Sequence, residues 1–173
     1  MAGIGNINFS EIPEQNAAIP AGIYPAYIVE SGGNPDDERT DANGLVASKS
    51  GKGKYLPMTF EIADGDYKGR KIKKSFNLEH VNPQVVSIAQ SELKSLLVAL
   101  GWNFTQKPCG PADTSEIHLI PLSIQIRQTR DQDNGVQSEI YKFLPKNSGS
   151  GYAAGNASAS APATPATPPW SRQ

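Results

Sequence analysis

The chain has 173 residues, a formal net charge of −1 at pH 7 and 38 % apolar residues. This length suggests one domain plus an additional segment, and the low apolar share indicates that part of the chain does not contribute to a core. A net charge near zero argues against a protein that coats nucleic acid with its whole surface, although a local basic patch remains compatible with it.

One cysteine and the lack of a long apolar segment exclude several further classes. Cys109 cannot form a disulfide within the chain, and no paired cysteines have the spacing of a zinc site. The first residues, MAGIGNINFSEIPEQN, lack the basic and then apolar order of a signal peptide. The longest apolar-rich stretch, residues 95–102, is far shorter than the roughly 18 residues of a membrane span. We therefore expect a soluble protein of a reducing cytoplasm.

The first third of the chain predicts an arm, a strand and a long loop. Residues 1–18 have no clear period and are expected to form an N-terminal arm. Residues 23–31 are apolar on both faces, which predicts a well-buried strand, and Pro25 within it favours an edge or a bulge. Residues 31–53 are rich in Gly, Asn, Asp and Ser, acidic at the start and basic at the end. They predict a long flexible loop.

The next two elements predict a β-hairpin. Residues 55–64 alternate regularly, and one face of this second strand carries Leu56, Met58, Phe60 and Ile62. A glycine-containing turn at residues 65–69 leads to a third strand at residues 70–78. If Ile72 and Phe76 face inward on this third strand, Lys74 must face inward as well unless a bulge intervenes.

One helix and two strands complete the predicted domain. Asn82 as N-cap, Pro83 as first helical residue and apolar residues every three or four positions predict an amphipathic helix that Gly101 ends. A loop at residues 102–116 precedes a fourth strand at residues 117–129. An Asn-Gly turn leads to a fifth strand at residues 136–145.

Composition separates the folded domain from the end of the chain. From residue 147 onward Gly, Ser, Ala, Thr and Pro predominate, and few of these residues can build a core. We therefore predict a folded domain at residues 19–146 and a disordered tail at residues 147–173.

The order of three strands, a helix and two strands is that of the OB-fold, a five-stranded and partly open Greek-key barrel. We therefore predict a mainly β protein with an OB-like barrel, one end of which is closed by the helix. Several other folds with five strands and one helix share this order, and fold alone does not establish function.

Positive charge is concentrated in the predicted hairpin and the loop before it. Residues 49–74 hold eight Lys and Arg against three acidic residues, a local net charge of +5. Strands 2 and 3 form the usual oligonucleotide face of an OB-fold, and single-strand sites need cations for phosphates and aromatic rings for bases. The candidate nucleic-acid-binding residues are Lys49, Lys52, Lys54, Tyr55, Arg70, Lys71, Lys73, Arg127 and Tyr141. The alternative is that these lysines serve solubility and edge protection while the tyrosines cover the sheet.

An ordered series of short motifs resembles a family of bacteriophage proteins catalogued as a domain of unknown function. The motifs are GKYLPMTFEI, DGDYKGRKI, FNL, NP and AQSEL, which begin at residues 53, 64, 76, 82 and 89. The members of that family resemble single-stranded-DNA-binding proteins of phage replication and recombination modules, and the resemblance covers about residues 22–144. It implies a sequence-independent single-strand binder with an OB-like fold in the cytoplasm of an infected bacterium. It carries over no catalytic residue.

The tail is similar to that of bacterial single-strand binders, which end in a disordered linker and a short tip that recruits partner enzymes. The tip here is TPPWSRQ, and Pro169 and Trp170 are the candidate partner-binding residues. It lacks the acidic residues of the bacterial tips, so the partner stays open, and a spacer with an incidental tryptophan is the alternative. Binders of this kind commonly assemble as dimers or larger oligomers, which makes a homo-oligomer compatible with this interpretation.

Motifs of catalysis are absent from the sequence. His80 and His118 each stand alone, and no HExxH, CxxC, nucleophile elbow or phosphate-binding P-loop is present. We expect neither catalysis nor a cofactor. The competing hypothesis for function is an adaptor of a replication or recombination module that binds proteins through Trp170, with weak or no direct contact to DNA.

Overall fold

The structure is a computed structural model that describes residues 18–130 and 135–146. Its strands are β1 (Gly22–Ser31), β2 (Val46–Ala47), β3 (Gly53–Ile62), β4 (Lys71–His80), β5 (Leu122–Arg130) and β6 (Val136–Leu144). Its helices are α1 (Pro83–Ala99) and a short 3-10 helix, η2 (Thr114–Ile117). The five long strands and the long helix follow one another in the order predicted, so the mainly β, OB-like fold class is confirmed.

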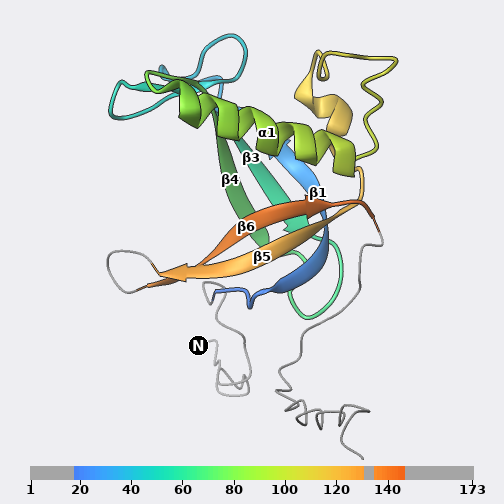
Figure 1. Ribbon diagram of the computed structural model, residues 1–173. Coiled ribbons are helices and arrows are strands. Elements are labelled where there is room, and N and C mark those ends of the chain that lie inside the picture. Colours follow the sequence, from blue (N-terminus) through green and yellow to red (C-terminus); the bar gives the residue numbers. More distant parts are fainter. Residues whose placement is uncertain (1–17, 131–134, 147–173) are drawn as a thin grey trace, which may run out of the picture.

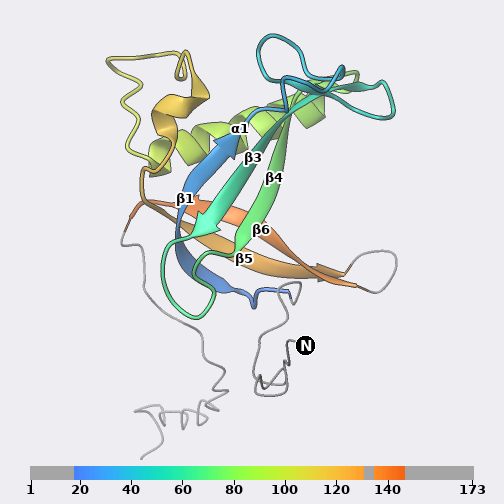
Figure 2. The ribbon, with the colours of Figure 1, turned by 180° about the vertical axis from the view of Figure 1, so that it is seen from behind.

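All strands belong to one antiparallel sheet that curls into an open barrel (Figure 1). β1 lies at its centre and pairs with β3 on one side and with β5 on the other, while β6 pairs with β5 and β4 pairs with β3. β4 and β6 do not pair with each other, so the sheet is not closed. We call the space between β4 and β6 the seam. Figure 2 shows β1, β3 and β4 side by side from behind, with α1 across one end.

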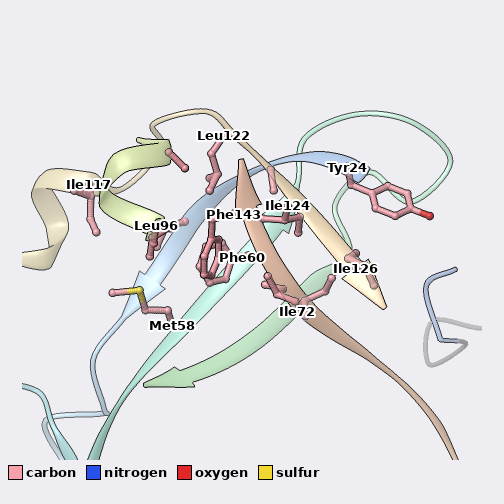
Figure 3. Close-up of a cluster of buried hydrophobic side chains, with 14 of the residues drawn as sticks. Tyr24, Met58, Phe60, Ile72, Leu96, Ile117, Leu122, Ile124, Ile126 and Phe143 are labelled. Atoms are coloured by element: carbon pink, nitrogen blue, oxygen red, sulfur yellow. The ribbon is translucent and has the colours of Figure 1, made fainter. Parts of the chain in front are cut away.

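The alternating residues of the strands fill the inside of the barrel (Figure 3). The predicted inner face of β3 is confirmed, because Leu56, Met58, Phe60 and Ile62 are all buried. The Phe60 and Phe143 rings pack with centroids 5.5 Å apart and join β3 to β6 across the interior. α1 contributes Leu96 from its buried face, as the apolar period of the helix predicts.

Local chemistry explains where α1 begins. The Asn82 side chain accepts a hydrogen bond from the backbone N–H of Gln84 at 3.0 Å, and Pro83 occupies the first helical turn. This is the N-cap arrangement that the sequence predicts. At the other end, Gly101 has φ +82°, which a residue with a side chain rarely adopts.

The predicted boundaries of three strands are wrong. β3 spans Gly53–Ile62 and not residues 55–64. The fourth strand, β5, begins at Leu122 and not at residue 117, because Thr114–Ile117 form η2 with Asp113 and Glu116 as its capping box. Leu119 then takes a positive φ of 58°, which interrupts any extended run before β5. β4 in turn continues to His80, two residues beyond its predicted end.

The predicted loop at residues 31–53 is ordered rather than flexible. The short strand β2 pairs with β3, and the backbone N–H of Gly33 donates to the Gly44 carbonyl at 2.8 Å. Gly53, where the segment joins β3, lies so close to β4 that a Cβ atom there would sit 1.9 Å from the Glu79 carbonyl oxygen. The Gly, Asn and Asp residues of this segment therefore form turns and close approaches of the backbone.

Pro25 shows how a proline is accommodated in a central strand. β1 pairs with β5 up to Ala26 and with β3 from Ala26 onward, so Pro25 has a partner strand on one side only. The edge environment predicted for this residue is correct locally, although β1 as a whole is central. A register shift between Ile28 and Glu30 adds a bulge further along.

Candidate nucleic-acid interface

A groove of about 680 Å³ opens at the seam of the barrel. One wall is formed by residues 68–73 at the turn and start of β4, and the other by residues 136–138 of β6 together with Ala18 and Ile19. Among the described residues of its lining, four have cationic side chains and none has a carboxylate; the four are Lys68, Arg70, Lys71 and Lys73. We call these four residues the seam group.

The turn between β3 and β4 positions the seam group. Gly65 and Gly69 take positive φ values of 90° and 79°, and the Gly69 N–H donates to the Ile62 carbonyl at 2.9 Å. The chain therefore reverses tightly and enters β4 directly after Arg70. From there the two-residue period turns Lys71 and Lys73 outward on either side of buried Ile72.

The outer face of the sheet next to the seam carries both signs of charge. The Lys71 Nζ donates to Glu30 Oε1 at 3.3 Å, and this hydrogen bond is the main cause that lowers the pKa of Glu30. The Tyr27 hydroxyl donates to Glu61 Oε1 at 2.7 Å, which raises the pKa of Tyr27. Lys73 lies opposite Thr59 of β3 and forms no ion pair with the residues that the structure describes. A polyanion would therefore meet Lys73 without a direct ion pair to break, although the Glu30 carboxylate attracts Lys73 as well, whereas it would have to displace Glu30 from Lys71.

A second set of candidates lies at the opposite end of β3. We call Lys49, Lys52, Lys54 and Tyr55 the loop group. The Lys54 Nζ lies 2.8 Å from Asp41 Oδ2 and 3.6 Å from Glu79 Oε2, and the hydrogen bond to Asp41 raises the pKa of Lys54. Tyr55 is half-buried where β3 pairs with both Val46 and Asn77. Lys49 and Lys52 are exposed and form no ion pair within residues 18–130 and 135–146.

The last two candidates form a pair on the β5–β6 hairpin. The Arg127 Nη2 lies 2.8 Å from Glu139 Oε2, and its guanidinium carbon lies 4.9 Å from the centre of the Tyr141 ring. The Tyr141 side chain stays 57 % exposed, so its outer ring surface remains accessible. The bulge between β5 and β6 at this point makes Tyr141 the residue without a direct partner in β5.

The structure thus divides the nine candidates into three places and does not line them up along one path. Arg70, Lys71 and Lys73 are brought together at the seam, the loop group lies at the far end of β3, and Arg127 and Tyr141 belong to the other hairpin. Pro169 and Trp170 lie outside the described residues. Lys68 belongs to the basic stretch of residues 49–74 but not to the nine predicted site residues. Ala18, Ile19 and Ser138 join the groove through contacts that no local sequence pattern encodes.

Lys74, the uncertain lysine of β4, faces inward. Its side chain is 11 % exposed, and its Nζ donates to Glu92 Oε1 at 3.0 Å and to the Ile140 carbonyl oxygen at 3.2 Å. The register of β3 and β4 is unbroken from Leu56 to Glu61, so no bulge turns this residue outward. Lys74 therefore joins α1, β4 and β6 above the groove and does not belong to the seam group.

Other polar clusters in the described part of the chain have structural partners. Ser31 Oγ lies 2.7 Å from His118 Nε2 and 2.7 Å from Thr114 Oγ1, which fastens η2 and the residues after it to the end of β1. The Asp113 carboxylate caps η2, and its hydrogen bond from the Ser115 N–H lowers the pKa of Asp113. Within residues 18–130 and 135–146 no three His, Cys, Asp or Glu side chains are placed to hold a metal ion.

Comparison with known families adds one assignment. The family model described as a protein of unknown function (DUF669) matches residues 6–162, which is most of the chain. The chain belongs to this family. Neither the comparison with curated proteins nor that with solved structures gives a match. The DUF669 description names no ligand. In the described part of this DUF669 chain, no helix is long and apolar enough to cross a membrane.

Proposed function

We propose that this member of the DUF669 family binds single-stranded DNA without sequence preference. The observation that carries the proposal is the groove at the seam of an OB-like barrel, whose described lining contains four cationic side chains and lacks a carboxylate. Phosphate contacts supply most of the affinity in sequence-independent binding, and lysine side chains follow a backbone without reading bases.

An exposed aromatic ring on the β5–β6 hairpin favours a single strand. Ser138 lines the groove, and Tyr141 follows three residues later on β6, about 10 Å further along the strand. Its exposed ring with Arg127 beneath it is suited to an unpaired base, since every base offers a π-face. In duplex DNA the bases are stacked on one another and are not available to such a ring.

The biological setting of the proposal rests on the family resemblance. The protein would protect single strands during phage DNA replication or recombination in the cytoplasm of the bacterial host. The tail would recruit partner enzymes through Pro169 and Trp170. In the competing adaptor hypothesis, the tail has the main role and the groove contributes little.

Fluorescence-anisotropy titration of the full chain with oligo(dT) and with duplex DNA of equal length tests the proposal. We expect tighter binding of oligo(dT), with an affinity that falls with salt at a log–log slope of about −0.7 per neutralised phosphate. Lys68→Glu combined with Lys73→Glu should weaken binding about tenfold or more at low salt.

Two matched variants separate the groove from general electrostatics and from the tail. Lys94→Glu with Lys107→Glu makes the same change of charge at α1 and the loop after it, away from the seam, and should weaken binding much less. Trp170→Ala should leave the affinity for oligo(dT) unchanged. Equal losses in the two double variants would show that the groove is not the site, and the absence of any oligo(dT) binding would leave the adaptor hypothesis.

A further inference from the structure

The chain enters the described structure on the wall of the groove. Ile19 is 2 % exposed, its backbone N–H donates to Ser138 Oγ, and the same hydroxyl donates back to the Ile19 carbonyl at 3.0 Å. Gln128 Nε2 donates to that carbonyl as well, at 3.4 Å. This anchor fixes Ile19 to β6 and leaves Ala18 in the lining of the groove. Residues 1–17 therefore continue from the groove itself.

The charge of these seventeen residues is opposite to that of the groove. They contain Glu11 and Glu14 and no Lys, Arg or His, whereas the seam group contributes four cations. Glu14 is four residues from Ala18, so its Cα lies within about 14 Å of that residue, and Glu11 lies within about 25 Å. The stretch from Lys68 to Lys73 spans about 17 Å if extended, so both carboxylates can reach it.

The groove also offers apolar surface to this segment. Val136, which lines the groove at the start of β6, is 47 % exposed. The sequence of residues 1–17 includes Ile7, Phe9 and Ile12 within a few positions of the two glutamates. A tethered segment of this length acts at an effective concentration in the millimolar range, so weak individual contacts are sufficient for partial occupancy.

We propose that residues 1–17 occupy the seam groove of their own chain through Glu11 and Glu14 and act as an internal competitor for polyanions. The carboxylates take positions on Lys68, Arg70, Lys71 and Lys73 that phosphate groups would otherwise hold. A ligand must displace them. Its apparent affinity is therefore the intrinsic affinity of the open groove multiplied by the fraction of chains whose groove is unoccupied. The contact itself does not depend on the proposed function, but its effect on DNA does.

The first experiment measures the contact without DNA. A nitroxide label is placed on Ser10→Cys in the full chain with Cys109→Ser, and the amide signals of residues 68–73 and 136–138 are followed by NMR. We expect broadening of these signals that is strongly reduced, to the level of an undocked tether, by Glu11→Gln with Glu14→Gln and at high salt. Broadening that is unchanged by the two substitutions would reflect a tethered segment that does not dock, and it would overturn the proposal.

A mixing control tests whether the contact lies within one chain. Chain that carries the nitroxide but no NMR isotope is mixed with isotope-enriched chain that carries no nitroxide. No broadening is expected in this mixture. Broadening of the groove signals there would assign the occupant to a second copy, which contradicts the inference as stated.

The second experiment measures the competition. Glu11→Gln with Glu14→Gln should increase the affinity for oligo(dT) about threefold to tenfold at low salt. Asp36→Asn with Glu38→Gln removes the same charge from an exposed part of the loop before β2 and should change the affinity much less. Equal gains in both variants would overturn the competition. Failure of the wild-type chain to bind oligo(dT) would contradict the proposed function, whereas the label experiment would still decide whether the groove is occupied.

Discussion

Lys73 and Lys74 are neighbours of the same type with opposite environments. Lys73 points outward beside the groove, whereas the Lys74 ammonium is nearly buried and is satisfied by Glu92 and the Ile140 carbonyl. A buried ammonium without partners would be costly, so this lysine is held by its contacts and in turn ties β6 to β4 and α1.

Substitution should separate these two roles. Lys74→Ala removes the donor to Ile140 and leaves Glu92 without its cation, so we expect the free energy of unfolding to fall by about 1–3 kcal/mol in urea titrations. The affinity of the folded protein for oligo(dT) should stay within about twofold. Lys73→Ala should show the reverse, with nearly unchanged stability and weaker binding. A Lys74→Ala protein of wild-type stability would show that the bridge across the seam contributes nothing.

Sequence reasoning reaches some of these residues and not others. The inward position of Lys74 follows from the two-residue period that Ile72 and Phe76 set. The ion pair between Lys54 and Asp41 does not follow from any periodic pattern. It depends on how the segment at residues 31–53 folds back against β3. The contact of Ile19 with Ser138 joins residues 119 positions apart, and no local pattern encodes it.

At the scale of elements, the ordered segment between β1 and β3 depends on one carboxylate. Asp41 accepts hydrogen bonds from the backbone N–H groups of Asn43 and Leu45 and from Lys54 Nζ. The hydrogen bond from Lys54 is the largest cause that lowers the pKa of Asp41 below its ordinary value. The segment is therefore held by an interaction that requires ionised Asp41.

This interaction should make stability depend on pH in a defined window. Because the pKa of Asp41 is lower in the folded than in the unfolded protein, its contribution is complete above the unfolded value of about 3.9. It is lost as the pH falls through the lower folded value. Urea midpoints of the wild type and of Asp41→Asn should therefore differ at pH 6, and the difference should shrink as the pH falls below about 3.9 and through the lower folded pKa. A constant difference over this range would mean that the ionisation of Asp41 does not stabilise the segment.

Elements with a clear period are also those that sequence reasoning places best. β3 and α1 were located to within two residues because their apolar residues repeat at two and at three to four positions. The start of β5 is not predicted correctly, because Ile117 and His118 have the character of strand residues. The 3-10 helix η2 at this point depends on its capping box, and the positive φ of Leu119 accompanies a contact with β1. The backbone N–H of Leu119 donates to the Ile28 carbonyl at 3.0 Å, a long-range contact.

On the scale of the whole molecule, the barrel is strongest at its centre and weakest at the seam. β3 has hydrogen-bonded strands along both edges, with β4 on one side and β1 and β2 on the other, whereas β4 and β6 each pair along one edge only. The groove lies where these two unpaired edges approach each other. The cationic groove thus lies between two strand edges that do not pair with each other in the described structure.

Amide hydrogen exchange should follow this gradient. We expect the slowest exchange in the residues of β1 and β3 that pair on both sides, and faster exchange in the amides of β4 and β6 that face the seam. NMR-detected exchange of the full chain measures both sets at once. Seam-facing amides that exchange as slowly as those of β1 would show that the barrel closes in solution.

The strand order of the barrel was accessible from sequence, whereas the assembly of the candidate site was not. Three strands, a helix and two strands indicate an OB-like arrangement because the OB-fold has that order, which several other folds share. The distance between Arg127 or Tyr141 and the seam group depends on the curvature of the sheet. No residue pattern in the sequence predicts this curvature. The sequence therefore located the cations of β4 correctly but joined them to rings that belong to another part of the barrel.

The anchoring of Ile19 by Ser138 has a consequence for biosynthesis. Among the described residues, Ile19 is the first buried apolar side chain, and its anchor Ser138 lies in β6, while β5, the second partner of β1, begins at Leu122. A nascent chain can pair β1, β3 and β4 early, but the barrel is completed only when β5 and β6 have been made, with the exposure to misassembly that late completion brings.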